Sequence, residues 1–173
     1  DTAALDEYLT DLGETLIDNT AASVRVAGLR IDAIGVDDAH RDLEDLDAAT
    51  TALGEMGDGA HLRLGVTHAP YRRVLDSFTD AGTDLLFAGH THGGQVRVPF
   101  SRKALVANCD IPLDQARGQS LWTHDGRTVP LNVSAGLGHS IYAPVRFGCR
   151  PEASVLVLRP RGGADSPEGL SAG

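Results

Sequence analysis

The chain has 173 residues, of which 42% are apolar, and a formal net charge of -9 at pH 7. This apolar content is enough for one hydrophobic core and too high for a disordered chain, while the length argues against two full domains. The acidic balance argues against a protein that coats nucleic acid, because neutralising phosphates requires a basic surface. No apolar run is long enough to span a membrane.

The amino-terminal part of the chain predicts two amphipathic helices and a β-hairpin. Helices are expected where apolar residues recur every three or four positions, and strands where apolar and polar residues alternate. These criteria predict a helix over residues 3–17, strands over 23–26 and 29–36, and a helix over 42–56. The dipeptide Ala27-Gly28 between the two strands suits a tight turn.

The middle of the chain predicts a compact βαβ unit. The predicted elements are a strand over 62–67, a helix over 70–81 and a short apolar strand over 84–88. Pro70 would take the first helical position, which proline favours. A strand, a helix and a strand within about thirty residues indicate two parallel, buried neighbours. Further short strands are expected over 95–100, 128–136 and 153–160.

Three histidines are candidate metal ligands. His90 and His92 follow an apolar strand, and alternate residues of an extended chain point to the same side. His68 ends the preceding strand, and parallel strands present their carboxyl ends at one edge of the sheet. Imidazole suits zinc, iron, manganese and other transition metals. We therefore expect a metal centre at this edge, although solvated loop histidines are the alternative interpretation.

The remaining polar residues carry weaker signals. Spacing gives no metal role to His40, His61, His124 or His139. Asp37 and Asp38 follow a predicted strand and offer carboxylates, but an acidic turn is the favoured interpretation. Cys109 and Cys149 lie far apart and outside any CxxC pattern, so we expect two buried free thiols.

The heptad GHTHGGQ at residues 89–95 resembles the terminal metal motif of calcineurin-like metallophosphoesterases, in the form of a bacterial branch whose members are often exported or membrane-associated. Further segments that resemble the family are residues 67–70, 35–38, 133–138 and 144–152. The resemblance implies an α/β fold that forms part of an α/β/β/α sandwich. It implies that residues 1–160 are the carboxyl-terminal portion of a metallophosphoesterase domain, and residues 161–173 are expected to form a disordered tail.

The resemblance also implies the chemistry of the parent enzyme. Members of the family hydrolyse phosphomonoesters or phosphodiesters with two divalent metal ions (manganese, iron or zinc), which an aspartate and the attacking hydroxide bridge. His68 and His90 would ligate one metal and His92 the other. The residues implied on the phosphate and substrate side are Gly93, Gly94, His139 and Arg146.

The sequence departs from the family in one respect. The family's first half carries, in this order, a DxH pair, the bridging aspartate of GDxxD and a GNH motif, and no segment of this chain matches that series. We therefore expect a portion of a larger phosphoesterase that holds one metal ion or none and is weakly active or inactive alone. The alternatives are a non-catalytic domain that binds a partner or a single metal, and a mononuclear hydrolase that uses the three histidines.

Two expectations concern partners. The parent enzyme would act on a phosphoester, and the branch's membrane association makes a lipid-linked one a candidate. Half of a sandwich leaves a sheet face uncovered, which favours a homodimer of this chain.

Overall fold

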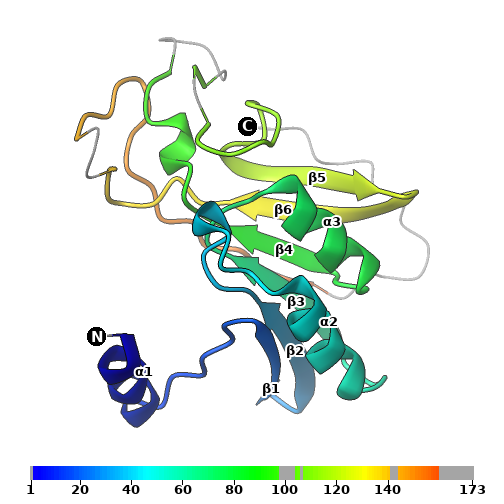
Figure 1. Cartoon of the computed structure of the whole chain (residues 1–173). Coiled ribbons are helices and arrows are strands. Elements are labelled where there is room, and N and C mark those ends of the chain that lie inside the picture. The colour runs from blue at the N-terminus through cyan, green and yellow to red at the C-terminus, as the bar shows by residue number, and fades with distance from the viewer. Residues whose placement is uncertain (1, 98–103, 106, 141–143, 160–173) are drawn as a thin grey trace.

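The structure, a computed structural model, describes residues 2–97, 104–105, 107–140 and 144–159 (Figure 1). In chain order the elements are α1 (Thr2–Asp11), β1 (Thr20–Val26), β2 (Leu29–Gly35), the 3-10 helix η1 (Ala39–Arg41), α2 (Leu46–Glu55), β3 (Leu62–Thr67), α3 (Arg72–Asp80), β4 (Leu85–Ala88), the 3-10 helix η2 (His92–Gly94), β5 (Gly118–His124) and β6 (Arg127–Val133).

The strands form one mixed 6-stranded sheet in the order β1-β2-β3-β4-β6-β5. Strands β2, β3, β4 and β6 run parallel in the centre, while β1 and β5 pair antiparallel with β2 and β6 at the two edges. Helices α2 and α3 lie on the same face of the sheet (Figure 1). The predicted hairpin and βαβ unit are both present, and the predicted α/β fold class is confirmed.

The hydrophobic core lies between the sheet and helices α2 and α3. Ile34 of β2, Leu86 of β4, and Leu75 and Phe78 of α3 are each 0% exposed. Gly65 of β3 lets α3 approach closely, because a Cβ atom at this position would lie 2.6 Å from the Phe78 ring. The helix-covered face therefore carries the packing that holds the strand ends in place.

All three α-helices are shorter than predicted. Helix α2 covers Leu46–Glu55 of the helix expected over 42–56, because the side chain of Asp45 caps its start. Helix α1 ends at Asp11 rather than near residue 17, because Gly13 has a φ of 85°, in the left-handed region where helices end. Helix α3 begins at Arg72, after an extended Tyr71 with φ -74° and ψ 141°. Pro70 therefore precedes the helix and does not take its first position.

The carboxyl-terminal part differs most from the prediction. The sequence does not predict strand β5, and β6 covers only part of the strand expected over 128–136. Val96 and Arg97 form isolated bridges, while residues 98–100 of that expected strand lie outside the described residues. Residues 153–159 form no strand, and Val155 is 92% exposed. Their alternating pattern is misleading because a strand also needs a neighbour to pair with.

The expected disordered tail over 161–173 lies outside the described residues. Among the residues that are described, no helix has the length and apolar character needed to cross a membrane.

Candidate metal centre

The candidate ligands lie at the carboxyl edge of the parallel strands. His68 directly follows β3, and His90 follows β4 after Gly89. Because β3 and β4 are parallel neighbours, both loops leave the sheet at the same edge. The backbone N–H of Gly89 donates to the carbonyl oxygen of His68 at 2.9 Å, which joins the two loops where they begin.

The imidazoles of His68 and His90 face each other. Nε2 of His68 lies 3.1 Å from Nδ1 of His90, and the rings meet edge to face at 76°. On the other side of its ring, Nε2 of His90 lies 3.1 Å from the carbonyl oxygen of Asn108. A carbonyl oxygen only accepts hydrogen bonds, so this shorter contact favours a proton on Nε2 of His90 and an unprotonated Nδ1 facing His68, while the side-chain amide nitrogen of Asn108 lies farther from Nε2, at 3.4 Å.

The surroundings favour the neutral form of the loop histidines. Burial lowers the pKa of His90, and the neighbouring His68 and His40 lower it further. Burial also lowers the pKa of His92, followed by the positive charge of Arg146. A neutral imidazole keeps the lone pair that a metal ligand needs, so the lowered pKa values of His90 and His92 favour the form that can bind a metal ion.

These features fit a transition-metal site in part. Two imidazole nitrogens 3.1 Å apart can contact the same ion, since metal–nitrogen bonds are about 2.0–2.1 Å long. The Asn108 carbonyl is the kind of partner that orients a metal-binding histidine. Within the described ranges, however, no three or more His, Cys, Asp or Glu side chains are grouped so that they could hold a metal ion. His68 and His90 therefore form a pair, and His92 is not grouped with them.

His92 lies in a loop with an unusual backbone. Left-handed φ angles occur at His90 (62°), His92 (50°), Gly93 (65°), Gly94 (78°) and Gln95 (47°). This region is sparsely populated by residues with a Cβ atom, and such residues cluster at functional sites. The N–H groups of Gly93 and Gly94 both donate to Thr91, to its Oγ1 at 3.2 Å and its carbonyl oxygen at 2.8 Å. These two donors are therefore used within the turn.

The other two residues implied on the substrate side lie beside the same loop. His139 is exposed, and its Nδ1 lies 3.1 Å from the carbonyl oxygen of Ser140. Arg146 is half-buried, and its guanidinium donates to backbone carbonyls that include those of His92 and Ala135. Both side chains act electrostatically on His92 and lower its pKa, after burial.

Both cysteines are free, as predicted. Cys149 is buried, and its Sγ lies 3.3 Å from the carbonyl oxygen of His92 and 3.5 Å from that of Gly93. A Cβ atom at Gly93 would lie only 2.7 Å from this sulfur, so the loop and the cysteine pack directly together. Cys109 is only half-buried, contrary to the expectation of two buried thiols, and burial raises its pKa.

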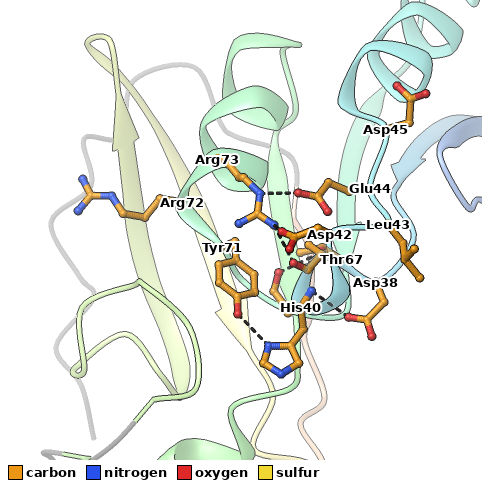
Figure 2. Close-up of polar contacts among 12 residues, drawn as sticks. Asp38, His40, Asp42, Leu43, Glu44, Asp45, Thr67, Tyr71, Arg72 and Arg73 are labelled. Atoms are coloured by element: carbon orange, nitrogen blue, oxygen red, sulfur yellow. Dashed lines mark hydrogen bonds and ion pairs between the residues drawn. The ribbon is translucent and has the colours of Figure 1, made fainter.

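The structure adds His40 to this edge of the sheet, a residue to which sequence spacing gives no metal role. Its ring centroid lies 4.5 Å from that of His90, and its Nδ1 lies 2.8 Å from the Tyr71 hydroxyl (Figure 2). Asp38 accepts a hydrogen bond from the backbone N–H of His40 at 3.0 Å, in keeping with the favoured acidic turn. Since η1 follows β2, which is also parallel to β3, the topology brings His40 to the same edge.

A polar network joins the turn around η1, which carries His40, to the start of α3 (Figure 2). Arg73 donates to the carbonyl oxygen of Ala39 at 2.7 Å and to Asp42 at 3.0 Å, and it also pairs with Glu44. The hydrogen bond with Glu44 is the main cause that raises the pKa of Arg73. The guanidinium carbon lies 4.6 Å from the centroid of the Tyr71 ring. The network therefore fixes the turn that carries His40.

Three curated bacterial proteins are similar to this chain. They are the uncharacterized metallophosphoesterase YkoQ of Bacillus subtilis (26% identical over 150 residues), the phosphodiesterase YaeI of Escherichia coli (28% over 154) and the uncharacterized metallophosphoesterase YkuE of Bacillus subtilis (26% over 159). The matches cover 87%, 89% and 91% of this chain, and 51% of each relative. No protein-family model and no solved structure matches the chain.

The chain has a mixed α/β fold and is similar to bacterial proteins named metallophosphoesterase or phosphodiesterase, which confirms the predicted resemblance. The chain spans about half the length of the curated relatives that it matches.

Proposed function

We propose that this chain is one portion of a metal-dependent phosphohydrolase that acts on a phosphomonoester or a phosphodiester. The observation that carries the proposal is the pair of imidazole nitrogens of His68 and His90, which lie 3.1 Å apart at the carboxyl edge of the parallel strands. Ligands are expected at this edge of an open α/β sheet. The names of the three bacterial relatives support the same class of enzyme.

In this proposal His68 and His90 hold one divalent metal ion, and His92 belongs to a second. Manganese, iron or zinc ions bound there would supply Lewis-acid activation of the phosphoryl group and of the attacking water. The contribution of the chain itself is orientation. The carbonyl of Asn108 holds the proton of His90 on Nε2, which keeps Nδ1 free of a proton and directed at His68.

The phosphoester would lie beside the loop that carries His92. Gly93 and Gly94 would border the phosphoester and leave room for it, because they have no side chains. Their N–H groups would not bind it, since both already donate to Thr91. The exposed His139 would line the substrate side through Nε2, because its Nδ1 faces the carbonyl of Ser140.

We infer that residues 1–160 are the carboxyl-terminal portion of a metallophosphoesterase domain and that 161–173 form a tail. This inference is supported by the coverage of about half of each relative, and by a histidine pair that lacks a third ligand among the described residues. The isolated chain would then bind one metal ion or none and be weakly active or inactive. A lipid-linked substrate and a homodimer of the chain stay predictions.

Metal content and manganese-dependent hydrolysis of bis(p-nitrophenyl) phosphate test the proposal. Both are measured on the 173-residue chain and on a longer protein that includes it. We expect at most one bound ion and negligible turnover for the chain, and turnover by the longer protein that His90→Ala abolishes. His61→Asn is the control, because His61 lies before β3 at the opposite edge of the sheet.

Two outcomes would contradict parts of the proposal. Full activity of the isolated chain would overturn the account of missing ligands. One tightly bound zinc ion without turnover in either protein would favour the alternative of a non-catalytic metal-binding domain.

A further inference from the structure

We propose that Arg146 is a positioning residue that holds the His92 loop in its left-handed conformation, and that it does not bind the substrate. The inference rests on the proposed function only where it assigns His92 to a metal ion. The contacts of the guanidinium are a property of the chain by itself.

The guanidinium of Arg146 is directed at backbone carbonyls of two separate loops. Nη1 donates to the carbonyl oxygen of His92 at 3.2 Å. Nη2 donates to Ala135 at 2.6 Å and to Gly136 at 3.1 Å, and Nε donates to Gly138 at 2.7 Å. An arginine has five N–H donors in a fixed plane, and most of them are used here. A phosphate could reach them only by displacing carbonyl groups of the protein.

The His92 loop has a strained backbone and therefore needs contacts that hold its conformation. His92 and Gln95 have φ angles of 50° and 47°, which residues with a Cβ atom rarely adopt. Such a conformation persists only where the surrounding structure over-determines it. A planar cation that bridges the His92 carbonyl to the loop after β6 supplies that constraint.

Backbone hydrogen bonds also hold the segment that carries Arg146 against the end of the His92 loop. The backbone N–H of Phe147 donates to the carbonyl of Gln95 at 2.9 Å, and the N–H of Arg97 donates to the carbonyl of Phe147 at 2.8 Å. Cys149 adds a second contact, with its sulfur 3.3 Å from the His92 carbonyl oxygen. Arg146 and Cys149, which lie in the same segment, therefore both contact the carbonyl group of His92.

The test compares Arg146→Ala and Arg146→Lys with the control Arg150→Ala, which changes an exposed arginine of the same segment. The first measurement is amide hydrogen exchange of residues 92–96 in the metal-free chain. The second is the NMR signature of the His92 ring, and the third is binding of Co²⁺ followed by visible absorption. Inorganic phosphate binding to the Co²⁺-loaded chain is measured as well.

We expect Arg146→Ala to speed exchange at 92–96 by tenfold or more and to alter the His92 ring signals, while exchange in β3 and β4 stays unchanged. Any Co²⁺ ion that His92 ligates should bind about 10–100-fold more weakly, as when groups that orient ligands are removed, while Co²⁺ held by His68 and His90 should be unaffected. Arg146→Lys should not restore the loop, because one ammonium group cannot reach the carbonyls of both loops. Added methylguanidinium at millimolar concentration should restore it in Arg146→Ala.

Unchanged exchange and ring signals in both variants would overturn the inference. A loss of phosphate affinity with unchanged exchange and Co²⁺ affinity would overturn it in favour of a substrate-binding arginine. If the unaltered chain binds no Co²⁺, an outcome that the proposed function allows for the isolated chain, then the exchange, the ring signals and the methylguanidinium rescue decide the role of Arg146.

Discussion

Helices α1 and α3 both carry apolar residues at helical spacing, yet their surroundings differ. Val74, Leu75 and Phe78 of α3 are 0% exposed and pack against the sheet. In α1, Leu5 is 54% exposed and Tyr8 is 61% exposed. Helix α1 stands apart from the sheet, whereas α3 lies on it (Figure 1).

This difference shows that periodicity identifies an amphipathic helix but not the surface that covers its apolar side. Most of the stability of a helix in a protein comes from the packing of that side. Substitutions on the α3 face should therefore change the free energy of unfolding far more than matching substitutions in α1. Trp122 lies 5% exposed beside α3 and is the single tryptophan of the chain, so its fluorescence can report unfolding of the packed region.

The largest expected effect is that of Phe78→Ala. The ring is fully buried, so its removal leaves a cavity and should lower the free energy of unfolding by about 3–5 kcal/mol. Urea denaturation followed by Trp122 fluorescence measures the change. A loss below about 1 kcal/mol would show that α3 is not the packed element described above.

The second-largest loss of unfolding free energy is expected from Arg30→Leu, on the α2 side of the core. Arg30 bonds the fully buried Asp32 through two contacts of 2.8 Å and also donates to the carbonyl of Met56, just past α2. Removing one partner of a buried pair costs about 3–5 kcal/mol, and partial exposure of Arg30 reduces this to about 2–3 kcal/mol. The double variant Arg30→Leu/Asp32→Leu should recover part of the loss.

The same pair gives a pH dependence. Burial alone would raise the pKa of Asp32, but hydrogen bonds from Arg30 and Ser23 and the charges of Arg30 and Arg63 lower it overall. The stabilisation is therefore present above the unfolded pKa of about 3.9 and is lost as pH falls through the lower folded value. The difference in unfolding free energy between the unaltered chain and Arg30→Leu should shrink in acid. A constant difference from pH 7 to pH 3 would argue against the ion pair.

A smaller effect is expected from Gly65→Ala, with Gly54→Ala as its matched control. The added Cβ at Gly65 meets Phe78 at 2.6 Å and Leu86 at 2.7 Å, so overpacking should cost about 1–3 kcal/mol. Gly54 lies in α2, where an added methyl group would meet nothing within 4 Å, so alanine there should stabilise by up to about 1 kcal/mol. Thermal unfolding should shift in opposite directions for the two variants. Equal shifts would contradict the close approach of α3 to β3.

The smallest effect belongs to α1. Tyr8→Ala and Leu5→Ala should each change the unfolding free energy by less than about 0.5 kcal/mol, because both side chains are already exposed. Denaturation curves that overlay the unaltered chain are the expected result. A loss comparable to that of Phe78→Ala would mean that α1 has a partner in solution, which light scattering would then reveal.

The sequence predicts the centre of the fold well. Buried parallel strands appear as short apolar runs, so β3 and β4 and the helix between them are recognisable, and the edge shared by His68 and His90 follows from them. Predicting that His40 lies at this edge requires one more inference, because its position depends on β2 being parallel to β3. That pairing joins elements distant in sequence, which periodicity does not report.

The carboxyl-terminal part is less predictable for different reasons. Strand β5 has few apolar residues because it is an edge strand, although the turn Asp125-Gly126 before β6 is a strong hairpin signal. Residues 153–159 alternate apolar and polar side chains without pairing in a sheet. The contacts of Arg146 are also beyond sequence reasoning, because they depend on the approach of two loops.

The strand order also has a consequence for folding kinetics. The two antiparallel hairpins at the edges join residues close in the sequence, so they can form on the microsecond scale. The parallel pairing of β4 with β6 must first close the long segment that contains the His92 loop. Loop closure of this kind slows folding, so the centre of the sheet should set the folding rate. The loop that carries His92 would then be among the last parts of the chain to take shape.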